Sequence, residues 1–446
     1  MAVQAERSVG IGLIGFGTIG TGVVKVLARN AGVIRQRLGF ALRLVRIADI
    51  DTTRDRGVDL TGIRLDADAA ALIADPEVEI VIELVGGYDL AKRFILAAIA
   101  AGKHVVTANK ALLAVHGKEI FAAAEAAGVD VLFEAAVGGG IPILRSLREG
   151  LAANHIERVV GILNGTTNFV LTEMERTEDS FDAVLKRAQV LGYAEADPSF
   201  DVDGIDAAHK LVLLAGMAFG AELTHKDVPT EGIRQMTPVD MEMAAELGYR
   251  IKLLGIARCH RDGAGSERIE VRVHPAMVPA GSMLANVDAA MNAIEVVGDA
   301  VGPTLYYGAG AGEMPTASAV VADLIEIARE IERGGSGPVS PLSYRPDALT
   351  TKALVPMGEV TGRSYLRFTA LDRPGVLAHI AGALADQGVG IESVVQKKTE
   401  RPGSAVPVIV VTHPTDYAAL RRALEVIDRQ DDVVAPTVVI RIEEDL

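Results

Sequence analysis

The sequence has a single cysteine, an excess of acidic over basic residues, and no long apolar run. Because Cys259 is alone, an intramolecular disulfide and a cysteine-rich zinc or iron–sulfur site are excluded. A chain without a disulfide framework is typical of a reducing compartment, so we expect a cytoplasmic protein. The 44 Lys and Arg against 59 Asp and Glu leave a net charge of −15, which disfavours a nucleic-acid-binding protein.

Membrane insertion and secretion are also disfavoured. Apolar runs such as residues 211–221 are shorter than the roughly 20 residues that a membrane-spanning helix needs. The first ten residues lack a basic segment followed by a long apolar one, so we expect no signal peptide. Hydrophobic residues make up 49% of the 446-residue chain, which excludes intrinsic disorder. The length predicts two to four domains at about 100–200 residues each.

The first 150 residues alternate between strand-like apolar runs and alanine-rich helical runs. We expect strands at residues 9–14, 42–50, 80–84, 104–107 and 129–133, and helices near residues 23–27, 90–101 and 117–127. This alternation predicts an α/β fold, a Rossmann-type and mostly parallel sheet with helices on both faces.

A glycine-rich motif separates the first predicted strand from the first predicted helix. In this Gly-x-Gly-x-x-Gly pattern the first glycine permits a tight turn, the second lets the backbone approach a pyrophosphate, and the third allows close helix–strand packing. Asp49 ends the next strand, where a carboxylate binds the ribose 2′-hydroxyl of NAD. We therefore expect NAD, with NADP left open by nearby arginines. The cofactor-binding residues expected here are Gly15, Phe16, Gly17, Thr18, Ile19, Gly20 and Asp49.

Beyond residue 150 the pattern changes. Residues 151–306 mix strand-like runs at 156–163, 251–258, 269–274 and 293–297 with helical runs at 181–191, 207–219 and 240–247, which predicts an α+β domain. We expect a polar turn at residues 164–168. Residues 332–362 include a stretch rich in Gly, Pro and Ser and are predicted to be a linker. Residues 363–446 follow a β-α-β-β-α-β order, typical of a ferredoxin-like module.

Two groups of charged residues are candidates for chemistry in the second region. Five carboxylates lie within residues 195–206, namely Glu195, Asp197, Asp201, Asp203 and Asp206. Asp206 and Lys210 are four residues apart at the start of a predicted helix and share one face. One interpretation is a solvated surface pair, worth only a few tenths of a kcal/mol. The other is a lysine poised for proton transfer, with a neighbouring carboxylate that fixes its position.

Two further segments follow strands of the first domain. Thr107 and Lys110 follow a strand whose carboxyl end faces the cofactor crevice, so Lys110 is either a solvated loop lysine or a group that reaches the substrate or the nicotinamide. Residues 134–141 (EAAVGGGI) combine one carboxylate with exposed carbonyls and no His or Cys. Such a set suits a hard monovalent cation better than a transition metal.

Taken together, these motifs resemble homoserine dehydrogenase. The resemblance rests on residues 161–171 (GILNGTTNFVL), the pair Asn109-Lys110, residues 191–198 (LGYAEADP) and the spacing from Asp206 to Lys210. Residues 363–446 separately resemble an ACT regulatory domain, through residues 371–377 (LDRPGVL) and 391–396 (IESVVQ). The resemblance also implies that residues 307–331 return to complete the dinucleotide-binding domain of residues 1–150.

The resemblance implies reversible hydride transfer between NAD(P)(H) and the pair L-homoserine and L-aspartate 4-semialdehyde, in threonine and methionine biosynthesis. Lys210 is then the proton donor and acceptor, Lys110 assists at the active site, and Asp206 acts beside Lys210. Glu195, Asp201, Asp206 and Lys110 would bind substrate, whose ammonium group suits the acids. Glu134, Val137, Gly139 and Ile141 would hold sodium or potassium. Thr107, Lys110, Gly192 and Gly312 would lie near the cofactor. Ala48 stands where many members of the family carry an arginine, which again favours NAD.

The resemblance also implies regulation and assembly. A turn that includes Asp372, Gly375, Val376 and Leu377 would cradle an amino-acid effector, for which L-threonine is the natural hypothesis. We expect a homodimer or homotetramer. The alternative enzyme is aspartate-semialdehyde dehydrogenase, which needs a catalytic cysteine, and Cys259 lacks a suitable setting. A non-enzymatic sensor of dinucleotides and amino acids is a second alternative.

Overall fold

The structure is a computed structural model that describes residues 7–263, 265–334, 340–396 and 404–446. The chain divides into two compact units. Unit 1 comprises Met1–Val159, Ala208–Asp227 and Met291–Lys352, and unit 2 comprises Val160–Ala207, Val228–Ala290 and Ala353–Leu446. The domain boundaries proposed from the sequence stay predictions. Among the helices of the described ranges, none combines the length and apolar character needed to cross a membrane.

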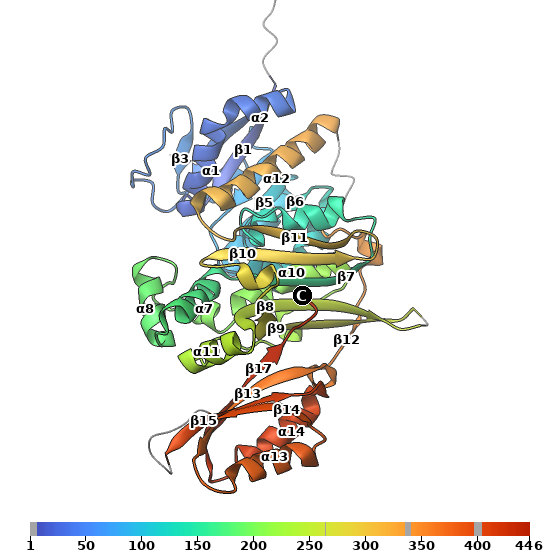
Figure 1. Ribbon diagram of the computed structural model, residues 1–446. Helices are drawn as coiled ribbons and strands as arrows, with labels where there is room; N and C mark the ends of the chain where they lie inside the picture. The colour runs from blue at the N-terminus through green and yellow to red at the C-terminus, as the bar shows by residue number, and fades with distance from the viewer. Residues whose placement is uncertain (1–6, 264, 335–339, 397–403) are drawn as a thin grey trace, which may run out of the picture. The chain divides into compact units, whose positions relative to one another are not determined.

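Unit 1 contains a six-stranded parallel sheet with the order β3-β2-β1-β4-β5-β6, of which β1, β3, β5 and β6 are labelled in Figure 1. Its strands are β1 (Ser8–Ile14), β2 (Ala41–Ala48), β3 (Arg64–Asp66), β4 (Ile80–Glu83), β5 (His104–Thr107) and β6 (Val131–Leu132). The order reverses between β1 and β4, and ligands of such sheets bind at the carboxyl ends of the strands beside that switch point. The predicted Rossmann-type sheet is therefore confirmed. The short edge strand β3 was not expected.

Helices cover both faces of this sheet. They are α1 (Thr18–Arg29), α2 (Ala31–Leu38), α3 (Ala69–Ile73), α4 (Asp89–Ala100), α5 (Lys110–Ala127) and α12 (Glu313–Arg333). The late helix α12 packs against α1, and its apolar residues Val320, Leu324 and Ile327 join the core formed by β1 and β4. The chain thus returns to this sheet nearly 200 residues after leaving it.

Unit 1 also contains shorter elements after β6. These are a 3-10 helix at Glu134–Ala136, α6 (Ile143–Arg145) with the π-helical turn Ser146–Gly150, the 3-10 helices His225–Asp227 and Pro346–Ala348, and the antiparallel hairpin of β10 (Met291–Gly298) and β11 (Gly302–Ala309). Strand β7 (Ile156–Ile162) and helix α10 (Ile205–Phe219) each begin in one unit and end in the other.

Unit 2 contains the long antiparallel hairpin of β8 (Tyr249–Arg261) and β9 (Glu267–Pro279). Its other elements before residue 353 are α7 (Gly165–Thr177), α8 (Phe181–Val190), α9 (Ser199–Val202), α11 (Pro238–Glu246) and the 3-10 helix Leu284–Asn286. The sequence predicted most of these elements, but α7 is a correction. Its first turn occupies the place of the expected polar turn at residues 164–168, because Asn164 caps the helix by accepting the backbone N–H of Thr167.

The C-terminal part of unit 2 has the expected β-α-β-β-α-β order. It consists of β13 (Thr361–Leu371), α13 (Val376–Asp386), β14 (Ile391–Gln396), β15 (Ala405–Thr412), β16 (Thr415–Asp416), α14 (Tyr417–Ile427) and β17 (Val433–Ile442), preceded by β12 (Ala353–Leu354) and the 3-10 helix Met357–Glu359. The ferredoxin-like module is confirmed, and its strand order is β17-β13-β15-β14. Its last strand also pairs in parallel with β9, so module and hairpin share one sheet within unit 2.

Candidate active site

The glycine loop between β1 and α1 has three glycines with three different surroundings. A Cβ at Gly15 would lie 2.6 Å from the carbonyl of Leu84, and the φ of Gly15 is +95°, so only glycine fits without strain. A Cβ at Gly20 would lie 2.3 Å from the Gly15 carbonyl oxygen. A Cβ at Gly17 would meet no atom within 4 Å. Gly17 therefore faces open space at the N-terminus of α1, where backbone N–H groups attract phosphate.

Asp49, just beyond β2, contacts this loop directly. Its Oδ2 accepts the backbone N–H of Phe16 at 2.5 Å. Arg56 also reaches the loop, because its Nε donates to the Phe16 carbonyl at 2.6 Å and its guanidinium lies over the Phe16 ring, 4.5 Å from the centroid. A carboxylate and a guanidinium thus stand together where the ribose of a dinucleotide would bind. The first suits a 2′-hydroxyl and the second a 2′-phosphate.

Glu83 is a buried carboxylate that the sequence analysis did not single out. It ends β4 next to the loop, is 1% exposed, and accepts the hydroxyl of Thr107 at 2.7 Å and the backbone N–H of Val85 at 2.8 Å. The Thr107 hydroxyl also accepts the N–H of Asn109. The side chain of Thr107 therefore orders the strand ends of β4 and β5. An acidic residue at the end of an otherwise apolar strand was the available signal.

One interpretation of the sequence placed Lys110 in a loop, but Lys110 is the first residue of helix α5. Asn109 caps the helix by accepting the N–H of Leu112 and donates to the carbonyl of Gly87 at 2.7 Å. A positive charge at a helix N-terminus opposes the helix dipole and costs about 0.3–1 kcal/mol. Lys110 is therefore not placed there for the stability of α5.

Glu134 lies at the start of the predicted cation-binding segment and is 5% exposed. Its two carboxylate oxygens accept the backbone N–H groups of Leu144 and Arg145, at 2.9 and 2.8 Å, and its own N–H donates to Asp323 on α12. Burial raises the pKa of Glu134. Gly139, in the same segment, approaches Gly310 so closely that a Cβ would lie 2.5 Å from its carbonyl.

The donor chemistry of this segment fits a hard monovalent cation. A carboxylate has about four lone-pair sites, so each Glu134 oxygen keeps one after accepting its N–H. The carbonyl of Ile141 accepts the N–H of Ile143 at 2.8 Å and keeps its second lone pair. In the described ranges no group of three or more His, Cys, Asp or Glu residues is arranged to hold a metal ion. The segment thus offers oxygens without the ligands that a transition metal prefers.

In unit 2, Asn164 brings two of the five clustered carboxylates together. Its Nδ2 donates to Asp201 Oδ1 at 2.7 Å and to Asp206 Oδ2 at 2.8 Å. Asn164 and Asp206 are 4% and 3% exposed. Asn164 lies in the motif of residues 161–171 but was not predicted to be a site residue. Its place as a helix cap next to the acidic segment could not be recognised without α7.

The remaining carboxylates of the cluster lie elsewhere. Asp203 pairs with Arg234, whose guanidinium also donates to Ser199. Asp197 is exposed, and its hydrogen bonds to Ser199 lower its pKa. Glu195 is exposed as well. The cluster is therefore not one site, because Asp201 and Asp206 share an amide while Asp203 has an arginine of its own.

Asp206 and Lys210 lie one turn apart on α10 and are 3% and 8% exposed. The interpretation as a solvated surface pair is therefore wrong. A lysine so deeply buried carries a desolvation cost that a surface position would avoid. The interpretation of Lys210 as a lysine poised for proton transfer stays a prediction.

The two further predicted glycines both end or begin helices. Gly192 follows α8 with a φ of +79°, and its N–H donates to the carbonyl of Gln189. Gly312 precedes α12 with a φ of +120°. These conformations favour glycine whether or not a cofactor is bound, so the proposed cofactor role of both stays a prediction.

The proposed effector turn lies between β13 and α13. Gly375 caps α13 with a φ of +95°, and Asp372 accepts the side-chain amide of Gln396 at 3.3 Å. Val376 is buried in the module core, whereas Leu377 is 42% exposed. The first backbone N–H groups of α13 therefore stand beside an exposed apolar side chain, as an amino-acid ligand would require.

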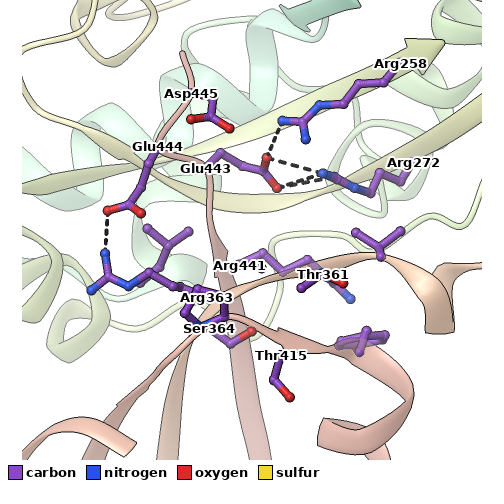
Figure 2. A pocket seen from close by; sticks show the side chains of 15 residues that line it. Arg258, Arg272, Thr361, Arg363, Ser364, Thr415, Arg441, Glu443, Glu444 and Asp445 are labelled. Atoms are coloured by element: carbon purple, nitrogen blue, oxygen red, sulfur yellow. Dashed lines mark hydrogen bonds and ion pairs between the residues drawn. The ribbon is translucent and has the colours of Figure 1, made fainter. Parts of the chain in front are cut away.

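A cavity of about 210 Å³ lies where the C-terminal module meets β8 and β9 (Figure 2). Figure 2 shows Glu443 between Arg258 and Arg272, with distances of 3.1 and 3.0 Å between carboxylate oxygen and guanidinium nitrogen. Arg441 makes two hydrogen bonds to Glu231, at 2.9 and 2.8 Å. The end of β17 is thus held to the hairpin by the ion pairs of Glu443 as well as by strand pairing, whereas Arg441 pairs with the segment before α11.

Another cavity, of about 690 Å³, lies in unit 1 between α5, the later part of α10 and residues 340–351. Its lining is mostly apolar and includes Phe121, Val212 and Leu342. None of the predicted site residues lines it. Cavity size therefore does not mark the chemistry of this protein.

Comparisons with known proteins cover almost the whole chain. Family models described as the NAD-binding domain of homoserine dehydrogenase, homoserine dehydrogenase, and the ACT domain match residues 15–134, 142–325 and 364–429. The chain is 48% identical over 439 residues to the homoserine dehydrogenase of Pseudomonas aeruginosa, covering 98% of this chain and 99% of that protein. The corresponding values for the homoserine dehydrogenase of Neisseria gonorrhoeae are 46% over 437 residues, 98% and 99%.

Solved structures show the same similarity. A crystal structure of a homoserine dehydrogenase from Thiobacillus denitrificans matches with a TM-score of 0.91 and 49% identity, covering 98% of this chain and 99% of that chain. A homoserine dehydrogenase from S. aureus matches with a TM-score of 0.75 and 31% identity over the same shares of both chains.

Proposed function

This chain belongs to the homoserine dehydrogenase family, and on that premise we propose how its residues carry out the reversible, NAD(P)-dependent interconversion of L-homoserine and L-aspartate 4-semialdehyde. One observation carries the activity: the similarity to proteins of that name extends over 98% of the chain at up to 49% identity. The family models for the cofactor-binding and catalytic parts both match. The predicted oxidoreductase activity is therefore confirmed at the level of the family.

The glycine loop holds the cofactor. The backbone N–H groups at the start of α1 bind the diphosphate beside Gly17, where the structure leaves room for it. A nicotinamide cofactor bound there would supply the redox chemistry, taking up a hydride when homoserine is oxidised and giving it back when the semialdehyde is reduced. Asp49 binds the adenosine ribose and favours NAD, while Arg56 makes NADP possible at the same place.

The substrate is held by opposite charges. Asp201 and Asp206 bind the ammonium group of homoserine, and Glu195 adds an exposed carboxylate from the neighbouring segment. Lys110 supplies a positive charge toward the substrate carboxylate. Burial of Asp206 strengthens its attraction to an ammonium group, because an ion pair is screened less in a protein interior than in water.

Lys210 moves the proton. When homoserine is oxidised, the Lys210 amine takes the proton from the hydroxyl oxygen, and when the semialdehyde is reduced, the ammonium returns it. Asp206, one helical turn away on α10, fixes the position of the lysine. Because Lys210 is buried, water is largely excluded around it, which strengthens its interactions with the substrate oxygen and with Asp206.

The cation site and the regulatory module complete the proposal. Glu134 with the carbonyls of Val137, Gly139 and Ile141 holds sodium or potassium, which orders the loop that connects β6 to α6. L-threonine binds at the turn before α13. Its effect reaches the substrate-binding acids because the module shares unit 2, and one sheet, with β9. We further propose that the protein is cytoplasmic and acts as a homodimer or homotetramer.

The test is the appearance of reduced nicotinamide absorbance with L-homoserine as the only substrate, measured with NAD and with NADP. Oxidation of homoserine without added phosphate is expected. Activity that requires phosphate and L-aspartate 4-semialdehyde would instead indicate aspartate-semialdehyde dehydrogenase. Cofactor binding without turnover would indicate a sensor. A strong preference for NADP would contradict the role proposed for Asp49.

A further inference from the structure

Asn164 occupies the junction of β7 and α7 and uses all of its hydrogen-bonding capacity. Its Oδ1 accepts the backbone N–H of Thr167 at 2.8 Å and the Thr167 hydroxyl at 2.9 Å. Its Nδ2 donates to Asp201 at 2.7 Å and to Asp206 at 2.8 Å. A primary amide has two donors and two main acceptor positions, so this side chain is fully satisfied.

The four partners determine which way the amide points. A backbone N–H can only donate, so the N–H of Thr167 requires the amide oxygen, and the amide nitrogen then faces the two carboxylates and donates to them. The reverse orientation would place the oxygen against both carboxylates. Asn164 is also only 4% exposed, so water cannot readily replace either donor.

The two carboxylates come from different elements. Asp201 lies on the short helix α9 and Asp206 on the first turn of α10, and Gly204 connects these helices with a φ of +83°. Like charges on adjoining elements repel, and at close range this repulsion acts against a fixed position of either side chain. The amide of Asn164 gives both carboxylates a common donor and so holds them at a set separation.

An amide supplies donors but no charge. The pair of carboxylates on Asn164 therefore keeps its attraction for a cation, and a substrate ammonium group is such a cation. We propose that Asn164 is a positioning residue for homoserine dehydrogenase activity: its side-chain amide sets Asp201 and Asp206 in the geometry that binds the substrate ammonium group. This inference rests on the substrate roles of these two acids in the proposed function.

A purely structural role for Asn164 as the cap of α7 can be separated from this one. Asp and Ser are both good helix N-caps, so Asn164→Asp and Asn164→Ser each keep an acceptor for Thr167 N–H. Neither variant offers two N–H donors to the acids. The first adds a negative charge and the second adds none, so a shared effect cannot come from charge alone.

The experiment measures KM for L-homoserine, KM for the nicotinamide cofactor, kcat and the thermal midpoint in the full-length protein. Asn154→Asp is the matched control, because the Asn154 side chain also uses both its donor and its acceptor, on the Leu151 carbonyl and the Val301 N–H, but lies outside the proposed site. We expect both Asn164 variants to raise KM for homoserine about 10- to 100-fold, as a small misplacement of binding groups does, with KM for the cofactor unchanged. The control should retain both constants.

Three results would overturn the inference. If both variants keep the wild-type KM for homoserine, Asn164 is only a cap. If Asn164→Asp alone raises it, the effect is one of charge and not of lost donors. If the wild-type chain turns over no homoserine, the proposed function fails and this inference with it, whereas the first two results leave the proposed function intact.

Discussion

Replacement of Gly17 by alanine tests the cofactor site most directly. A Cβ at this position would touch no protein atom within 4 Å, and the φ of −76° is accessible to alanine. Alanine is a poorer helix N-cap than glycine, which destabilises the protein, but it also lowers the entropy of the unfolded chain, which stabilises the protein. Because the two effects oppose each other, the free energy of unfolding should change by less than about 1 kcal/mol. The protein itself therefore has little reason to require glycine here.

Binding of the cofactor, in contrast, does depend on glycine at this position. The added methyl group would occupy the space through which a diphosphate approaches the N–H groups of α1. A hydrogen bond to a charged group contributes about 1.5–3 kcal/mol, and each 1.4 kcal/mol is a factor of ten in affinity. Loss of one such bond should therefore raise the dissociation constant for NAD(H) about 10- to 100-fold.

At Gly15, in contrast, we expect alanine to destabilise the protein itself. Alanine there would have a φ of +95° and a Cβ 2.6 Å from the Leu84 carbonyl, which costs about 1–3 kcal/mol of stability. Gly32→Ala is the control, because Gly32 also has no neighbour within 4 Å but lies in α2, away from the loop. Titration of NADH by fluorescence gives the affinities, and thermal denaturation gives the stabilities. Wild-type NADH affinity in Gly17→Ala would refute the proposed contact between this loop and the diphosphate.

Three more predictions concern other parts of the chain. Lys210→Ala should lower kcat about 10²- to 10⁴-fold, as loss of a general acid–base group does, with NADH affinity retained; kcat within tenfold of wild type would contradict the proton-transfer role. Asp372→Ala should raise the L-threonine concentration needed for half-inhibition, measured by the homoserine assay, and unchanged inhibition would place the effector elsewhere. Lys252 is fully buried, and burial lowers its pKa to about 8. Between pH 8 and 9.5 the unfolded chain then holds more protons at this group than the folded chain, so stability rises with pH by about 2 kcal/mol from this group. Lys252→Met should lose that rise in denaturant titrations at the two pH values, and an equal rise in the variant would refute the shift.

The threonine experiment is better done with a point variant than by truncation before the ACT module. Strand β17 pairs with β9, and Glu443 lies between Arg258 and Arg272 of the hairpin. Removal of the module would therefore expose the edge of β9 and take the Glu443 carboxylate from Arg258 and from the buried Arg272, which otherwise pairs with Glu270. A loss of threonine response in such a shortened chain would not distinguish a missing effector site from a damaged catalytic unit.

Local patterns in the sequence were sufficient for the fold class and for the cofactor motif. The apolar runs of β1, β4 and β5 are continuous because strands of a parallel sheet are buried on both faces, and this signal depends only on neighbouring residues. The glycine loop is equally local, since the turn, the open face and the helix packing are set within residues 15–20. The predicted β-α-β-β-α-β module is confirmed for the same reason.

Only the tertiary structure decided which polar residues act together. Glu83 and Thr107 are 24 residues apart, and Asn164 and Asp206 are 42 apart, so no local pattern connects them. Helix α7 was missed because its cap and first turn are polar and look like a loop until Asn164 is seen to accept the N–H of Thr167. The sequence by itself determined an α/β architecture, a dinucleotide loop and an acidic segment next to a lysine. The fold then divided that acidic segment between Arg234 and Asn164, because only packing determines which donor lies near each carboxylate. Asp203 pairs with Arg234 at the surface, whereas the buried Asp206 shares the Asn164 amide with Asp201.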